Sequence, residues 1–580
     1  MFFRHFLQII MLFVLICVVA HPQKSHAADI KKPQPEMATG LQTISSERGE
    51  SFMAVTANPY ATQAAYDILS RGGSAVDAAI AAQLVLGLVE PQSSGLGGGA
   101  FALVYDAKSK RLHTYDGRET APNLAGPFLF FENGEPLSFK EAVIGGRSVG
   151  VPGVPMLLSD LHEKYGVLTW MELFDDAIKL ADEGFTVSPR MAKMVAADAD
   201  DLRKDPAARA YFLPNDKPVE AGYNLKNIAY RDTLKDYQFY NARRFYRGEV
   251  ARSIVYKVQN YDGNPGLLSL ADFQNYSVKE RPPVCGPYRA YIVCSMGQPS
   301  SGALTLLQIL GMLEHFDIRA ENAKSWHIIA QASALAFADR AIYMADPDFV
   351  NTPDIALINP DYLKSRAALI DPDKPLNQIK AGTPPDWNGK LFDAGETLTQ
   401  PGTTHLSIID KDGNIVSMTS SIEGAFGAHI MTDGFLLNNQ LTDFSFNPLG
   451  DDRKFVANAV EPGKRPRSSM SPTIVFNAKG DPVLILGSSG GSRIINHVLQ
   501  RIIAVIDWGV PIDDALAAPH ILARGETIEL DNPEYQAALE AMGDTTLINT
   551  INSGLTAIQI KDKITIGTAD PRREGQAKGK

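Results

Sequence analysis

A sharp change in composition at Thr403 constrains the fold of this chain more than any other feature. Residues from about 367 to 402 are dense in proline, glycine, aspartate and lysine and show no apolar periodicity. That composition is typical of a surface linker. From Thr403 onwards, apolar and polar residues alternate in paired runs around short polar turns. This pattern predicts β-hairpins, with turns at Asp412-Gly413, at Lys479-Gly480 and within residues 555–569.

Other segments have the composition and apolar spacing of helices. They contain many alanines or place apolar residues on one face, and two of them are separated by adjacent glycines. In the long buried helix among them, His327 is most simply a packed core residue. Hairpins and helices without a strand–helix–strand rhythm predict an α+β layered sandwich with an antiparallel sheet. The predicted helices span residues 59–71, 74–88, 324–345 and 496–509.

The first 27 residues resemble a secretory signal peptide. Arg4 precedes an apolar run over residues 6–20, which is shorter than the roughly 20 residues of a membrane-spanning helix. Small residues then place a cleavage site after Ala27. An uncleaved membrane anchor is the alternative. We therefore expect an exported protein, periplasmic or secreted, that does not contact the membrane after signal removal.

The net charge and the cysteines bear on the binding partners and on the redox compartment of the protein. The formal net charge is −11, which disfavours nucleic acid and anionic membranes as partners. Cys285 and Cys294 would lie directly opposite each other if Arg289 and Ala290 form a two-residue turn. A disulfide is then geometrically reasonable in an oxidising compartment, and a pair of buried thiols is the equal alternative.

The glycine-rich segment at residues 95–99 has the form of a nucleotide-binding loop but the wrong context. A predicted helix precedes it and an apolar strand follows it. Dinucleotide-binding loops have the reverse order. The sequence therefore disfavours nucleotide binding.

Thr403 is a candidate nucleophile because it follows the linker directly and opens a buried-type strand. A threonine hydroxyl needs a base, and the α-amine of an N-terminal threonine can serve as one. That amine titrates at about pH 7.7–8.0, close to working pH. A threonine in mid-chain can acquire a free amine only by cleavage of the preceding bond. The pattern alone is weak, since many strands begin with threonine.

Several motifs resemble those of the γ-glutamyltransferase family. TTHLSIIDKDGNIVSMTSSIEGAFG, GFLLNNQLTDFS, GKRPRSSMSPT, LGSSGGSRII and TADPR match, in this order, motifs of its small subunit. GGSAVDAAIAAQLVLGLVEPQSSGLGGG and DGRETAP match its large subunit. The resemblance extends from about residue 40 to about residue 572. It implies the four-layer αββα sandwich of N-terminal-nucleophile hydrolases, built from associated large (28–402) and small (403–580) chains of one precursor, without metal or organic cofactor.

The resemblance also implies catalytic roles. Thr403 would attack the carbonyl of Gly402 to split the precursor, and later the substrate amide. Ser421 stands where the family usually has a second threonine that contacts the nucleophile, and it keeps the hydroxyl. Gly490 and Gly491 would donate backbone N–H groups to the oxyanion, where the absence of Cβ permits close approach.

A second group of residues would bind the γ-glutamyl group, which carries an α-carboxylate and an α-ammonium. Arg118 matches the family arginine that binds the carboxylate with its two-pronged guanidinium. Ser468 and Ser469 would donate hydroxyl hydrogen bonds to the same carboxylate. Gln440 and Asp443 would accept from the ammonium. Together these side chains describe a pocket for a zwitterion.

Two features depart from the family pattern. Glu423 stands where the best-studied members have an asparagine that touches the substrate carboxylate, which it would repel unless it turns away or is protonated. The stretch between Asp443 and Lys464 is shorter than in members with a lid loop and lacks tyrosine. We expect a pocket that admits bulkier donors.

The resulting hypothesis is a γ-glutamyltransferase with glutathione hydrolase activity. Thr403 would take the γ-glutamyl group from glutathione or a related compound, and water or an amino acid or peptide acceptor would resolve the ester. A glutaryl or cephalosporin-type acylase uses the same machinery; Glu423 and the short lid favour it, whereas Asp443 opposes it, because a glutaryl group has no ammonium. A periplasmic binding protein that never matures is a third possibility.

Overall fold

Two antiparallel sheets form the centre of the chain in the computed structural model, which describes residues 46–389, 392–395 and 402–580. The predicted signal peptide and part of the linker lie outside these ranges. One sheet, here called the β12 sheet, has the order β23 (Gln576–Gly579), β2 (Met53–Thr56), β12 (Gly402–Ile409), β13 (Ile415–Glu423), β3 (Gly99–Asp106), β4 (Arg111–Gly117) and β9 (Lys279–Arg281). The other, the β17 sheet, has the order β1 (Glu47–Gly49), β22 (Ile564–Ala569), β21 (Thr556–Lys561), β17 (Pro482–Gly487), β16 (Thr473–Asn477), β11 (Tyr291–Ser295) and β10 (Val284–Tyr288).

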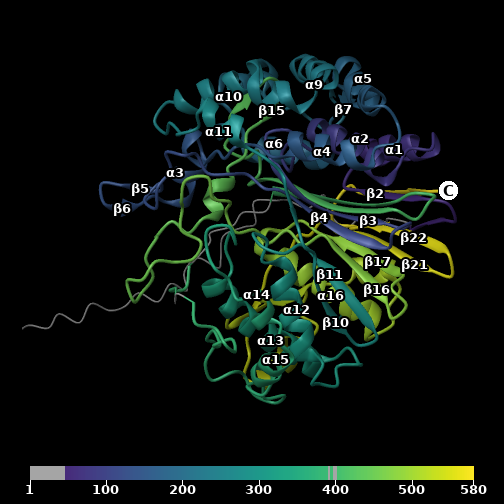
Figure 1. Cartoon of the computed structure of the whole chain (residues 1–580), viewed down its shortest axis with the longest axis vertical. Coiled ribbons are helices and arrows are strands. Elements are labelled where there is room, and N and C mark those ends of the chain that lie inside the picture. The colour runs from purple at the N-terminus through teal and green to yellow at the C-terminus, as the bar shows by residue number, and fades with distance from the viewer. Residues whose placement is uncertain (1–45, 390–391, 396–401) are drawn as a thin grey trace, which may run out of the picture. The chain divides into compact units, whose positions relative to one another are not determined.

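Helices cover the outer face of each sheet (Figure 1). The β12 sheet is covered by α1 (Pro59–Ser70), α2 (Ala75–Val89), α4 (Val154–Tyr165), α5 (Asp175–Glu183) and α9 (Ile228–Arg247). The β17 sheet is covered by α12 (Gly302–Leu313), α13 (Ala323–Tyr343) and α16 (Ile494–Ile506). The arrangement is helix, sheet, sheet, helix, which confirms the predicted four-layer sandwich.

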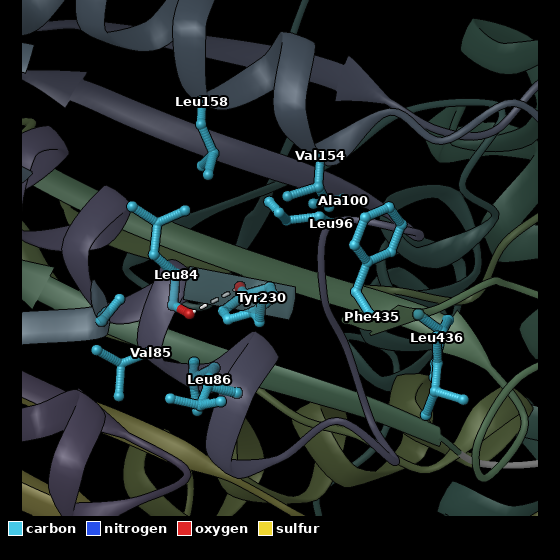
Figure 2. Packing of buried hydrophobic residues seen from close by; sticks show 14 of the residues in the cluster. Leu84, Val85, Leu86, Leu96, Ala100, Val154, Leu158, Tyr230, Phe435 and Leu436 are labelled. Atoms are coloured by element: carbon cyan, nitrogen blue, oxygen red, sulfur yellow. Dashed lines mark hydrogen bonds between the residues drawn. The ribbon is translucent and has the colours of Figure 1, made fainter. Parts of the chain in front are cut away.

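Alternation along the strands separates two hydrophobic cores. In β2, Ala54 belongs to the core that includes α1 and α2, whereas Met53 and Val55 belong to the core that the two sheets share. This is the period of two expected when both faces of a strand are buried. Figure 2 shows the first core, where Tyr230 of α9 donates a hydrogen bond to the carbonyl of Leu84 on α2 at 2.9 Å.

The predicted helices and hairpins are confirmed. Helix α2 begins after Ser74, whose hydroxyl accepts from the backbone N–H of Asp77 while the Asp77 carboxylate accepts from that of Ser74, a reciprocal cap. His327 of α13 is fully buried, and its Nδ1 lies 2.6 Å from a carboxylate oxygen of Asp544. Helix α16 spans Ile494–Ile506 rather than residues 496–509, because it continues directly from a short 3-10 turn that begins at Gly491.

The structure also resolves the cysteine alternatives in favour of a disulfide. Cys285 on β10 pairs in register with Cys294 on β11, and their sulfur atoms are bonded. The turn between the strands consists of Arg289 and Ala290, as the sequence indicates, and Arg289 has a φ of 53°.

Candidate active site

The bond between Gly402 and Thr403 lies at a β-bulge where β12 begins. Gly402 pairs with Glu423 and Thr403 with Ser421, which leaves Ile422 as the extra residue on β13. Glu423 has a φ of 79°, a conformation that side chains other than glycine rarely adopt. A Cβ at Gly402 would lie 2.4 Å from the carbonyl oxygen of Glu423. Only glycine therefore fits immediately before Thr403.

The Ser421 hydroxyl connects the candidate nucleophile with the candidate scissile bond. Its Oγ donates to the carbonyl oxygen of Gly402 at 2.9 Å and lies 3.1 Å from Oγ1 of Thr403. A hydroxyl has one hydrogen, so Thr403 Oγ1 donates to Ser421 while Ser421 donates to Gly402. The Thr403 hydroxyl is thus held beside a carbonyl group that is already polarised. Both side chains are buried.

A small pocket gathers nearly all of the predicted site residues. Its volume is about 20 Å³, which is room for about one water molecule. Gly402 and Gly490 are the two predicted site residues absent from its lining, and Met470 and Ile494 line it without having been predicted. Predicted residues in the lining are Arg118, Thr403, Ser421, Glu423, Gln440, Asp443, Ser468, Ser469 and Gly491.

The charged residues at one end of the pocket pair with each other. Arg118 donates from Nη2 to the Asp443 carboxylate, and Nε2 of Gln440 donates to the same oxygen at 3.2 Å. The family resemblance implies that Arg118 and Asp443 bind opposite ends of a zwitterion, whereas in this structure they pair with each other. Oε1 of Gln440 is buried and has no hydrogen-bond partner among the described residues. This oxygen is an acceptor available to a bound cation.

Arg340 supports the two serines and was missed by the sequence analysis. Its Nη2 donates to Oγ of Ser469 at 2.9 Å, and its Nε donates to Oγ of Ser301 at 2.8 Å. The Ser301 hydroxyl in turn donates to the carbonyl of Ser468 at 2.7 Å. Burial lowers the pKa of Arg340 well below its usual range. A charged residue in α13 (Ala323–Tyr343), a helix that the sequence predicts to be largely buried, was the available signal.

Glu423 faces the pocket and is anchored. Its Oε2 accepts a hydrogen bond from Nδ2 of Asn439 at 2.7 Å, and its backbone N–H donates to Oγ of Ser421 at 2.9 Å. The Glu423 side chain therefore stays in the pocket lining, and its backbone N–H is part of the Ser421 hydrogen-bond network.

The turn that contains Gly490 and Gly491 connects β17 to α16. These glycines have φ values of 131° and 57°, which glycine adopts without steric cost. Within the ranges that the structure covers, no hydrogen bond is donated by either N–H group. The turn therefore presents two backbone donors that the protein itself does not use, and Gly491 lines the pocket.

Glu119 is a second residue that the sequence analysis missed. It is fully buried beside Arg118, whose Nη1 lies 3.7 Å from its Oε2. Burial raises the pKa of its carboxyl group to about 8, against the opposing effect of the Arg118 guanidinium. Neither carboxyl oxygen has a hydrogen-bond partner among the described residues. The carboxyl group is consequently protonated at neutral pH.

One arginine holds the backbone of the candidate nucleophile. Nη1 of Arg573 donates to the carbonyl oxygen of Thr403 at 2.9 Å. Arg573 directly follows the TADPR motif, which brings the C-terminal segment to β12.

None of the helices in the described ranges has the length and apolarity needed to cross a membrane.

Comparisons with known proteins agree with this arrangement. The family model described as Gamma-glutamyltranspeptidase matches residues 61–580. The glutathione hydrolase proenzyme of Bacillus subtilis (strain 168) is 36% identical over 575 residues, which covers 95% of each chain. That of Escherichia coli (strain K12) is 35% identical over 565 residues, covering 93% of this chain and 94% of the relative. The crystal structure of cephalosporin acylase from Bacillus halodurans superposes with a TM-score of 0.81 at 26% identity, covering 92% of this chain and 97% of the other.

Proposed function

This chain belongs to the gamma-glutamyltranspeptidase family, and we propose that it is a self-cleaving glutathione hydrolase whose nucleophile is Thr403. The observation that carries the proposal is the Ser421 hydroxyl, which bonds the Gly402 carbonyl oxygen and lies beside Thr403 Oγ1. One group thereby touches both partners of the first reaction.

In self-cleavage, Thr403 Oγ1 attacks the carbonyl carbon of Gly402. As it attacks, the hydroxyl gives its proton to Oγ of Ser421, and Ser421 gives its own proton to the Gly402 oxygen, on which negative charge develops. When the tetrahedral intermediate collapses, this proton moves to the Thr403 nitrogen, the Gly402–Thr403 peptide bond breaks, and an ester between Gly402 and the Thr403 side chain remains. Water hydrolyses this ester and yields a large chain that ends at Gly402 and a small chain that begins at Thr403.

In turnover, the new α-amine of Thr403 takes the proton of Oγ1 as the hydroxyl attacks a γ-glutamyl amide. The N–H groups of Gly490 and Gly491 stabilise the oxyanion, for which their unused donors are suited. The Thr403 α-ammonium gives this proton to the amine of the donor, which leaves, and the γ-glutamyl ester of Thr403 remains. Water, or the amine of an amino acid or peptide acceptor, then resolves the ester.

The zwitterionic end of the donor binds by breaking the Arg118–Asp443 pair and contacting both of these residues. Its α-carboxylate takes the place of Asp443 on Arg118 and accepts from the Ser468 and Ser469 hydroxyls. Its α-ammonium donates to Asp443 and to Oε1 of Gln440, which has no partner among the described residues. In the uncleaved chain these groups line a pocket of about 20 Å³, and we propose that it widens to admit a donor after cleavage.

We further propose export to the periplasm or the exterior after removal of residues 1–27. The Cys285–Cys294 disulfide supports an oxidising compartment. Sequencing the N-terminus of the large chain from cell fractions tests this proposal, and a mature chain starting at Ala28 outside the cytoplasm is the expected result.

An acylase is the second candidate function, because cephalosporin acylase shares the fold and Glu423 lines the pocket. Hydrolysis of γ-glutamyl-p-nitroanilide and glutaryl-p-nitroanilide by the processed enzyme distinguishes the two. These compounds differ in the α-ammonium, which Asp443 and Gln440 would bind. We expect clear preference for the γ-glutamyl compound, and that preference should fall in Asp443→Asn. Preference for the glutaryl compound would establish the acylase instead.

A further inference from the structure

His497 lies directly behind the Gly490–Gly491 turn. It occupies the first turn of α16 and is fully buried. Its Nδ1 lies 3.0 Å from the carbonyl oxygen of Ser489. A Cβ at Gly490 would come within 2.6 Å of Cε1 of His497, so the imidazole packs against the backbone of Gly490. No motif in the sequence singled out this residue.

The protonation of the imidazole follows from its contacts. The Ser489 carbonyl can only accept, so Nδ1 carries the proton and donates. Burial lowers the pKa of His497 to about 3, so the ring is neutral at any working pH. Its Nε2 is buried and has no hydrogen-bond partner among the described residues, and the ring packs against that of His520 in a tilted arrangement, 4.5 Å between centroids.

The Ser489 carbonyl belongs to the same peptide group as the Gly490 N–H. It accepts a second hydrogen bond, from Oγ of Ser488 at 2.7 Å. Hydrogen bonds accepted by a peptide carbonyl polarise the group and strengthen its N–H as a donor. His497 therefore acts on the N–H of Gly490 through one peptide plane, and it fixes the direction in which that N–H points.

We propose that His497 is a positioning residue for the oxyanion hole, one that orients and strengthens the Gly490 N–H during turnover. The inference rests on the proposed role of Gly490. This positioning role predicts an effect on catalysis that a role in packing alone does not predict. The scissile Gly402 carbonyl is held by Ser421, so loss of the His497 hydrogen bond should impair turnover and spare self-cleavage.

The test compares His497→Leu with His497→Asn, two side chains of nearly equal size. Asparagine can donate to the Ser489 carbonyl and leucine cannot. We expect both variants to be processed like wild type. With γ-glutamyl-p-nitroanilide, kcat should fall by about tenfold or more in the leucine variant, since direct loss of an oxyanion donor costs about 100-fold or more. The asparagine variant should retain most of kcat, and KM should change little in both.

His327→Leu is the matched control, because it also removes a buried, hydrogen-bonded histidine. It should lower the melting temperature without lowering kcat. Equal kcat in His497→Leu and wild type would overturn the inference. So would equal losses in the leucine and asparagine variants, or a leucine variant that is not processed, because each indicates packing alone. A wild-type enzyme that is processed but inactive on γ-glutamyl-p-nitroanilide would instead refute the proposed function.

Discussion

At the scale of single residues, self-cleavage depends on a hydroxyl at position 421. Ser421→Ala removes the donor to the Gly402 carbonyl and the partner of Thr403 Oγ1. We expect self-cleavage to slow by about 100-fold, the usual cost of losing one oxyanion donor. Ser421→Thr keeps the hydroxyl and should process at close to the wild-type rate. The rate is measured by following purified precursor on denaturing gels.

Ser420→Ala is the control for this series. The Ser420 hydroxyl bonds the carbonyl of Gly99 instead, at 3.3 Å. Its loss should leave processing unchanged. Processing of Ser421→Ala at the wild-type rate would contradict the role given to Ser421.

Glu119 should make stability depend on pH. An unfolded glutamate has a pKa near 4.5, and burial raises the folded value to about 8. Between these values the unfolded chain releases a proton that the folded chain retains, so the free energy of unfolding falls as pH rises from about 5 to 8. Glu119→Gln mimics the protonated form and should lack this loss, on the order of a few kcal/mol.

Melting temperatures of wild type and Glu119→Gln at pH 5 and pH 8 check this prediction. The melting temperature of the variant should rise relative to that of wild type as the pH rises. A difference that is the same at both pH values would show that Glu119 does not titrate between them.

Among single residues, a recognisable motif was necessary for a prediction but not sufficient. Arg118, Asp443 and the two serines were found because their neighbours resemble a family pattern. Glu119 was missed although it stands beside Arg118 in the DGRETAP motif, and Arg340 lies outside the quoted motifs. Their importance comes from burial and from contacts with residues distant in the sequence, which no local pattern encodes.

At the scale of elements, the bulge at the start of β12 positions the scissile bond. Gly402→Ala would bring Cβ to 2.4 Å from the Glu423 carbonyl oxygen, so the backbone must shift. Displacement of reacting groups by about 1 Å can cost about 100-fold in rate. We expect slower self-cleavage by about tenfold or more on the same grounds.

Gly126→Ala is a suitable comparison, because a Cβ there meets open space. It should process normally. A Gly402→Ala precursor that cleaves as fast as wild type would show that the close approach at the bulge does not matter.

Hairpins could be predicted because they are local. Alternation on both sides of Asp412-Gly413 predicts the two strands that the structure shows as β12 and β13. The bulge could not be predicted, since it depends on Ile422 donating from its N–H to the Ser93 carbonyl across the fold. Helix α16 likewise begins earlier than predicted because it continues from the glycine turn before it. The spacing of apolar residues in the sequence does not reveal such a turn.

At the scale of the whole molecule, the segments before and after the scissile bond both contribute strands to the β12 sheet, and these strands are interleaved. β12 lies between β2 and β13, and β13 pairs with β3 through Ser421 and Gly99. Such pairings join residues far apart in the sequence, which explains why the strand order was not foreseen. Separation of the two segments would expose unpaired strands and both hydrophobic cores.

Cleavage should therefore leave the two chains bound to each other without a covalent link. We expect one species by size-exclusion chromatography in buffer and two chains on a denaturing gel. The disulfide does not join them, because Cys285 and Cys294 both precede the cleavage site. Separation of the chains in buffer alone would contradict the expectation that the β12 sheet stays assembled after cleavage.

The assignment of Thr403 as the nucleophile is tested most simply by measuring the intact mass of purified wild type beside that of Thr403→Ala. We expect two masses for wild type, one of them that of a chain beginning at Thr403, and a single uncleaved mass for the variant. A wild-type protein that stays whole, a small chain that begins elsewhere, or cleavage of the variant at the same bond would contradict the assignment of Thr403 as the nucleophile.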